Sequence, residues 1–308
     1  MKSIKKIDIH EHSSVFAEWI PRERNSEYHI LSPEELLKIY DELNIEKGVL
    51  LPLLSPEVWN GQITNENCKM IAEQYPDRFL WFCNIDPRME TEEGNWTFDE
   101  LFAHYKKLGA KGLGELTANL SVDDPRMDTL FFHCEKENLP VMIHISPKVG
   151  FSYGIVDELG LPKLDAIMTK YPDLKIIGHS QAFWSEISAD NTEAIRWTNS
   201  LEKVREGRLA EMLRKHPNLY CDLSASSGAI AMIRDEEYAI KFIEEFADRI
   251  LYGCDVCAAH NRQQYVLNDW LIKMVDEEKI SCENYRKIVR ENAIKLLQLD
   301  KSEENHEK

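Results

Sequence analysis

The chain has 308 residues, of which 43% are hydrophobic and 30% charged, and its formal net charge is −17. This composition is typical of a folded globular protein with a large apolar core, and the negative charge argues against nucleic acid or an anionic membrane as a partner. No apolar run approaches the roughly 20 residues of a membrane-spanning helix, and no signal-peptide core follows the basic start, so we expect a cytoplasmic protein.

Short apolar runs rich in β-branched residues alternate with amphipathic segments along almost the whole chain. The runs predict eight strands, at 7–12, 47–53, 79–85, 112–116, 140–146, 174–180, 219–225 and 250–256. The amphipathic segments predict helices at 33–44, 64–75, 98–109, 127–138, 161–172, 204–217, 238–249 and 266–279. A further helix is predicted at 282–297.

Eight strand–helix units fit either a closed barrel or an open doubly wound sheet. A nucleotide-binding open sheet would carry a glycine-rich phosphate loop, and neither G-x-G-x-x-G nor the P-loop pattern occurs. The pattern therefore favours the α/β class and a single (β/α)8 TIM barrel over residues 1–300, with an additional C-terminal helix packed against its outside. The polar segment 301–308 is expected to be a flexible tail.

Metal-competent side chains stand at the C-terminal ends of five predicted strands: His10, His12, Glu115, His144, His179 and Asp255. Barrel enzymes place their chemistry at this end of the strands. Because side chains alternate along a strand, His10 and His12 point to one face. A single such residue is more often a buried core histidine or a helix cap, but the joint pattern predicts a divalent-metal site.

The same positions resemble a known family. The segments DIHEH, MIHIS, IIGHS and YGCDV, with the closing YRKIVRENAIKLLQL, are similar to the amidohydrolase superfamily, and more narrowly to its amidohydrolase-2 branch. That branch contains aminocarboxymuconate semialdehyde decarboxylase, and the resemblance spans nearly the whole chain. It implies four metal ligands, His10, His12, His144 and Asp255. It also implies that His179 is a second ligand or a polarising acid.

The resemblance leaves the metal centre partly open. Zinc is the expected ion, with manganese or iron as alternatives, because imidazole and carboxylate suit all three. Glu115 stands on strand four, where relatives with two ions carry a bridging carboxylate or a modified lysine. The number of ions, one or two, therefore stays open, and Glu115 is either a bridging ligand or a residue that supports the ligands.

The main functional prediction is a metal-dependent hydrolase that activates water to cleave an amide, lactone or ester bond in a small organic molecule. In this reaction Asp255 carries the proton and His179 polarises the substrate. The alternative is a metal-dependent non-oxidative decarboxylase of the same superfamily. A second alternative is a barrel that binds metal or ligand without catalysis. The substrate is not determined by the sequence, and a homo-oligomer is compatible with it.

Loop residues add candidates for substrate contacts. A decarboxylase needs a cationic anchor for a carboxylate, and the candidates are Arg22, Arg24, Arg88 and Arg262, each of which would otherwise be a solvated surface charge. Phe183 and Trp184 directly follow the strand of His179, and they would either line the substrate pocket or pack the loop onto the barrel rim. Other aromatic residues in strand-following loops are Trp19, Trp59 and Phe151.

Overall fold

The computed structural model describes residues 4–20, 29–58, 62–89, 97–198, 202–256 and 261–299. All eight predicted strands are present, as β1 (Lys6–Glu11), β2 (Ile45–Leu50), β3 (Phe79–Trp81), β4 (Leu113–Leu116), β5 (Val141–Ser146), β7 (Ile176–His179), β8 (Leu219–Asp222) and β9 (Ile250–Leu251). A short additional strand, β6 (Ile155–Val156), pairs with the end of β5. The predicted tail at 301–308 lies outside the described residues.

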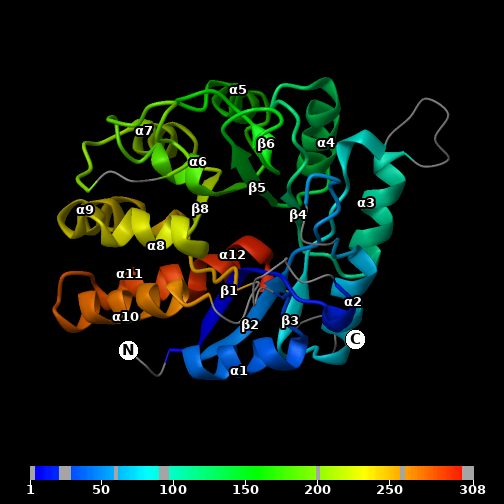
Figure 1. Cartoon of the computed structure of the whole chain (residues 1–308), viewed down its shortest axis with the longest axis horizontal. Helices are drawn as coiled ribbons and strands as arrows, with labels where there is room; N and C mark the ends of the chain where they lie inside the picture. The colour runs from blue at the N-terminus through cyan, green and yellow to red at the C-terminus, as the bar shows by residue number, and fades with distance from the viewer. Residues whose placement is uncertain are drawn as a thin grey trace.

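The strands form two parallel sheets, of order β1-β2-β3 and β4-β5-β7-β8-β9, that join into one ring (Figure 1). Cys83, just after β3, exchanges backbone hydrogen bonds of 2.9 and 2.8 Å with Gly112 and Gly114 at β4. At the other seam, Ile9 of β1 donates to the carbonyl of Tyr252 after β9 over 3.0 Å. The chain therefore has the predicted α/β fold, a TIM barrel.

The predicted helices occur within a few residues of their expected bounds. They are α1 (Pro33–Leu43), α2 (Asn65–Gln74), α3 (Phe98–Lys107), α4 (Pro125–Lys136), α5 (Pro162–Lys170), α7 (Arg208–Lys215), α9 (Glu236–Phe246) and α10 (Gln263–Asp276). Two helices were not predicted, α6 (Gln181–Ser185) and α8 (Ala225–Ile233). Helix α8 packs against α6, α9 and α10, so apolar residues surround it and its sequence lacks the one-sided pattern of a surface helix.

The C-terminal helix consists of α11 (Cys282–Arg286), a π-helical segment at Lys287–Glu291 and α12 (Asn292–Leu297). The prediction that it packs against the outside of the barrel is wrong for α12. Its Ala293, Leu296 and Leu297 join the cluster that fills the barrel interior, with Ile7, Ile9, Val49, Leu51, Phe82, Met142, Ile177 and Leu251. The amide of Asn292 also donates to the carbonyl of Ile250 at the start of β9. Helix α12 thus covers the N-terminal end of the barrel (Figure 1).

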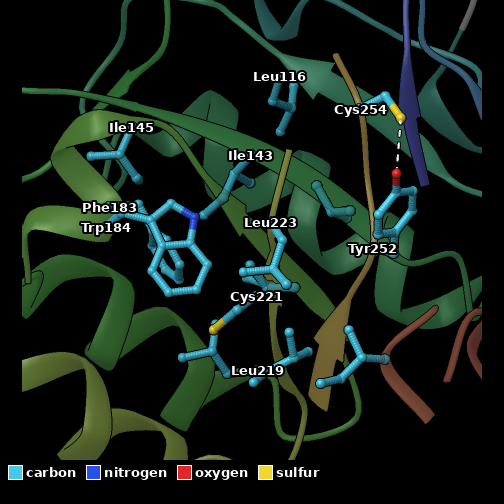
Figure 2. Close-up of a cluster of buried hydrophobic side chains, with 14 of the residues drawn as sticks. Leu116, Ile143, Ile145, Phe183, Trp184, Leu219, Cys221, Leu223, Tyr252 and Cys254 are labelled. Atoms are coloured by element: carbon cyan, nitrogen blue, oxygen red, sulfur yellow. Dashed lines mark hydrogen bonds between the residues drawn. The ribbon is translucent and has the colours of Figure 1, made fainter. Parts of the chain in front are cut away.

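Phe183 and Trp184 belong to α6 and are fully buried. Figure 2 shows them beside Ile143 and Ile145 of β5, in the core between the barrel and its helices. The indole Nε1 of Trp184 donates to the backbone carbonyl of Asp222 over 2.8 Å. Of the two expected roles, these rings take the packing role, and they do not line a substrate site.

Among the described helices, none is long and apolar enough to cross a membrane.

Asp165 joins α5 to α7 through three charged or polar neighbours. It accepts hydrogen bonds from Arg208, Lys215 and His216 at 2.9, 2.7 and 2.5 Å. Partial burial opposes its ionisation, but His216 and the two cations outweigh that cost and hold the pKa of Asp165 below its usual 3.8. A lowered carboxyl pKa stabilises the fold above pH 3.8, and this contribution is lost as the pH falls through the folded-state pKa.

We predict that Asp165→Asn lowers the free energy of unfolding at pH 7 by about 1–2 kcal/mol, because three donors lose a charged acceptor. The difference from the wild type should shrink as the pH is lowered toward 3. Urea unfolding at both pH values measures it, with Glu244→Gln, an exposed position on α9, as the control. An unchanged difference at low pH would contradict the assigned charge.

Candidate active site

The six residues singled out in the sequence lie together at the C-terminal end of the barrel: His10, His12, Glu115, His144, His179 and Asp255. Three overlapping groups of three bring their ligand atoms within 4.8 Å of one another, namely His10–His12–Glu115, His10–His179–Asp255 and Glu115–His144–His179. All are buried except Asp255, whose side chain is 18% exposed. Asp255 is therefore the carboxyl group of the cluster that is most accessible from outside.

The centre of the cluster is a close pair of ring nitrogens. The Nε2 atoms of His10 and His12 are 3.2 Å apart. Glu115 Oε2 lies 3.3 Å from the Nε2 of His12 and 3.6 Å from that of His10. Asp255 Oδ1 lies 3.7 and 3.9 Å from the same two nitrogens. Two imidazoles and two carboxylates thus converge on one point.

A bulge in β1 turns the two histidines inward. Asp8 pairs with Gly48 and Glu11 with Leu50, so three steps along β1 match two along β2. Ile7 and Ile9 lie in the barrel interior. With strict alternation the next inward residue would be Glu11, but the extra residue brings His10 and His12 to the interior side instead. Period-two reasoning correctly placed both histidines on one face, but it could not locate this bulge.

Asp8 faces the opposite way and fastens β1 to the end of β9. Its Oδ1 accepts the amide hydrogens of His10 and Cys254 at 3.0 and 2.9 Å, and its Oδ2 accepts the Tyr40 hydroxyl of α1 at 2.8 Å. Tyr40 reaches Asp8 across Gly48, where any Cβ would overlap the phenol ring. Burial raises the pKa of Asp8 to about 7. The three donors offset part of the cost of burying this carboxyl group.

Glu11 makes the second side-chain link across the same seam. Its carboxylate accepts the amide hydrogens of His12 at 2.9 Å and Val256 at 3.2 Å. Between these links, the amide of Asp255 donates to the carbonyl of His10 over 2.8 Å. Asp255 has a left-handed backbone, with φ of 52°, a conformation that aspartate tolerates better than most non-glycine residues. The seam therefore fixes Asp255 relative to His10 and His12.

Asp222, at the end of β8, holds two of the histidines and was not singled out in the sequence. Its Oδ2 lies 2.8 Å from the Nδ1 of His10 and 2.9 Å from the Nδ1 of His179. It also accepts the hydroxyl of Ser224 at 2.5 Å. An ionised carboxylate only accepts hydrogen bonds, so both rings must donate through Nδ1. The rule that pointed to Glu115 and Asp255, an acid at a strand end, would have identified Asp222 as well.

The other two histidines are fixed in the same tautomer. The Nδ1 of His12 lies 2.9 Å from the carbonyl oxygen of Leu51, and the Nδ1 of His144 lies 2.7 Å from Oε1 of Glu115. Both partners are acceptors, so both rings donate through Nδ1 and direct the Nε2 atom elsewhere. The Nε2 of His144 is buried and has no hydrogen-bond partner among the described residues.

The charges in the cluster favour a cation. Burial opposes the charged form of His10, but three carboxylates outweigh it and hold its pKa well above 6.5: Asp255, Glu115 and Asp222. Burial also opposes ionisation of Glu115, yet the neighbouring imidazoles hold its pKa well below 4.5. Burial lowers the pKa of His144, which keeps its Nε2 lone pair available. A divalent ion would meet the same field and displace the proton from His10.

These observations fit a divalent-metal site. The donors are imidazole nitrogens and carboxylate oxygens, the ligand types of zinc, manganese and iron. Each ring is oriented by a hydrogen bond from its other nitrogen, as is usual for metal-binding histidines. The buried Nε2 of His144 would gain a partner in a bound ion.

The remaining candidates do not join the cluster. Arg88 forms ion pairs with Glu57 and Asp86, each at 2.5 Å, so its guanidinium is already neutralised by protein carboxylates. Arg262 lies over the ring of Tyr265 at 4.8 Å. Trp19 is 79% exposed, and Phe151 is 45% exposed. Three predicted loop residues lie outside the described part of the chain: Arg22, Arg24 and Trp59.

Residues 7–299 match the model of a protein family described as amidohydrolase. No curated protein sequence matches the chain. Among solved structures, 2,6-dihydroxybenzoate decarboxylase from Rhizobium is 20% identical with a TM-score of 0.61, covering 96% of this chain and 99% of its own.

Two other solved structures are similar over the same span. A 5-carboxyvanillate decarboxylase from Novosphingobium aromaticivorans, complexed with manganese and 4-hydroxy-3-methoxy-5-nitrobenzoic acid, is 19% identical with a TM-score of 0.58 and coverage of 96% and 97%. A probable 2-pyrone-4,6-dicarboxylic acid hydrolase from Acinetobacter baumannii, with citric acid bound, is 17% identical with a TM-score of 0.60 and coverage of 96% and 100%. At these identities the likeness shows the barrel fold.

We predict that Asp222→Asn disturbs the orientation of His10 and His179, because the neutral amide loses the charge that both Nδ1–H groups share at Oδ2 and must turn its NH₂ group either toward these rings or toward the backbone N–H of Ser224. In the metal-free protein, the downfield proton signals of the two Nδ1–H groups should shift or vanish. The dissociation constant for manganese should rise by about 10- to 100-fold. Asp173→Asn, at an exposed position, is the control. Wild-type signals and affinity in Asp222→Asn would contradict this role.

Proposed function

Because the chain belongs to the amidohydrolase family, we propose that this metal-dependent enzyme removes carbon dioxide from a ring-bearing carboxylic acid. The observation that carries the proposal is the likeness, over 96% of the chain, to two solved decarboxylases. The His–carboxylate cluster at the C-terminal end of the barrel is consistent with it. The predicted alternative thus has more support than the main prediction of a hydrolase.

In this proposal a divalent ion is held by His10, His12, His144 and Asp255, with Glu115 and His179 completing the cluster. One decarboxylase similar to this chain contains manganese, so manganese joins zinc as a first candidate. When bound, such an ion orients an anionic substrate and polarises its oxygen atoms. The cluster is buried on its other sides, so the substrate approaches from the side of Asp255.

We assign the role of proton carrier to Asp255. It is the most exposed carboxyl group of the cluster, and its Oδ2 lies 3.8 Å from the Nε2 of His179. In the proposed reaction Oδ2 of Asp255 takes up a proton from solvent and gives it to the ring carbon that bears the carboxylate, while Oδ1 stays toward His10 and His12. The carbon–carbon bond then breaks, its electron pair stays on the ring and carbon dioxide leaves. His179 would hold the proton carrier in place between turnovers.

A hydrolase remains the second candidate, and Glu115 is the observation that favours it. Its Oε2 faces the Nε2 atoms of His10 and His12, and the carboxylate would bridge two ions if its Oε1 exchanged the Nδ1–H of His144 for a second ion. Two ions would activate water, and Asp255 would transfer its proton to the leaving group. The number of ions bound per chain in the wild type and in Glu115→Gln distinguishes the hydrolase from the decarboxylase. Loss of one ion out of two is expected only if Glu115 bridges them.

We predict that His144→Ala and His10→Ala lose the bound divalent ion, because each removes an oriented Nε2 donor from the cluster. The metal content of the purified variants, measured by elemental analysis, tests this. His104→Ala, at an exposed position on α3, is the matched control and should keep the wild-type content. Full occupancy in both cluster variants would refute the ligand assignment.

We also predict that the manganese- or zinc-loaded protein releases carbon dioxide from hydroxylated benzoic acids and leaves lactones and N-acyl compounds intact. Asp255→Asn should lower kcat by about 10²- to 10⁴-fold, the usual contribution of a positioned general acid. Carbon dioxide release and product chromatography measure both outcomes, with Asp173→Asn as the control. Hydrolysis of a lactone or amide without carbon dioxide release would favour the second candidate.

A further inference from the structure

The segment after β5 folds back over His144. Asn119 fixes this segment, because its side chain accepts the amide hydrogen of Gly150 at 2.6 Å and donates to the carbonyl of Gly154 at 3.0 Å. Gly154 has a φ of 110°, and a Cβ there would lie 2.7 Å from the Cδ2 of His144. Only glycine allows the main chain to pass this close to the imidazole. The loop is therefore built against the candidate site.

Three aromatic rings lie along this side of the site. The ring centroid of Tyr153 is 4.6 Å from that of His144, and the ring of Trp197 is 6.2 Å away. Phe151 packs edge-on against Trp197 at 5.1 Å. His144 is only 4% exposed, while Phe151 is 45% exposed and the other two rings are partly exposed. The rings thus stand between the buried imidazole and solvent.

Arg196 ties together the two loops that carry these rings. It is fully buried, and its Nη1 and Nη2 donate to the carbonyl oxygens of Asp157 and Glu158 at 3.1 and 3.3 Å. Its charge is balanced by Glu193 at 3.4 Å and Glu186 at 3.8 Å. A buried guanidinium is costly unless it is well paired, and these bonds link the loop of Trp197 to the segment that follows Phe151 and Tyr153.

We propose that Phe151, Tyr153 and Trp197 form an aromatic wall that binds the planar ring of the substrate, and that Arg196 is the positioning residue of this wall. The inference rests on the proposed function for the location of the substrate. Flat rings stack favourably on aromatic faces, whereas a puckered saturated ring fits them less well. Lys148, whose Nζ lies 5.6 Å from the centroid of Phe151, adds a positive charge on the same loop for an anionic substrate.

The test is the binding preference of the manganese-loaded protein for flat over puckered rings. Calorimetry compares a set of hydroxylated benzoates with the cyclohexane analogue of each, so that charge and size stay nearly constant. The wild type should bind the aromatic acids about tenfold more tightly, as expected for loss of favourable stacking. Trp197→Ala should abolish the preference, Trp197→Phe should retain most of it, and Arg196→Met should weaken it at unchanged manganese content.

Two controls separate this role from a structural one. Phe132→Ala, at an exposed ring on α4, and Arg126→Met, at an exposed arginine paired with Asp124, should leave the preference unchanged. Equal affinity of the wild type for both kinds of ring, or binding of neither, would overturn the proposal. So would an unchanged preference in Trp197→Ala, which stays informative even if Arg196→Met fails to fold.

The measurement does not depend on turnover. A preference that is lost in Trp197→Ala, in a protein that releases no carbon dioxide, would support the wall and count against the decarboxylase. If the wild type releases carbon dioxide but Trp197→Ala keeps the full preference for flat over puckered rings, the result would support the decarboxylase and overturn the aromatic wall.

Discussion

The barrel closes between its last and first strands through side-chain carboxyl groups as well as through backbone hydrogen bonds. Asp8 accepts the amide hydrogens of His10 and Cys254, and Glu11 accepts those of His12 and Val256. The amide of Asp255 donates to the carbonyl of His10 between these links. These links set the distance from Asp255 to His10 and His12. A backbone-only seam would leave the left-handed Asp255 without this support. The chemistry of the site therefore depends on two carboxyl groups that never face it.

A second set of acceptors orients the rings once the backbone is in place. Asp222 accepts hydrogen bonds from the Nδ1–H groups of His10 and His179. Glu115 accepts one from the Nδ1–H of His144, and the carbonyl of Leu51 accepts one from the Nδ1–H of His12. All four rings then direct Nε2 away from these acceptors, where a cation can use it. Glu115 and Asp222 are ionised in a buried place, and each is stabilised by imidazole neighbours. The cluster is thus organised for a divalent ion before any ligand arrives, which is the condition for a precise reaction geometry.

The barrel fold positions the metal-competent residues, while the loops at the strand ends determine which molecules can bind beside them. Phe183 and Trp184, which directly follow the strand of His179, pack α6 onto the barrel, and Trp184 also hydrogen-bonds the backbone carbonyl of Asp222. Tyr153 and Trp197, which no strand-end rule selects, are the rings that reach His144. At the other end, α12 covers the barrel interior, so the accessible chemistry is confined to the end where the loops lie. In the proposed function, substrate recognition and catalysis would both take place at this end of the barrel.

The sequence by itself determined the eight strands, most of the helices and the six residues of the cluster, because strand and helix periodicity and strand-end position are local properties of the chain. Tertiary structure alone decided the bulge that turns His10 and His12 inward, since a bulge depends on the register against β2. It alone placed α12 across the barrel end, because an amphipathic helix does not specify which apolar surface it covers. It also revealed α8, whose apolar surface contacts several helices, and the pairing of Asp222 with rings from β1 and β7. Such pairings are long-range contacts, and no local pattern in the chain encodes them.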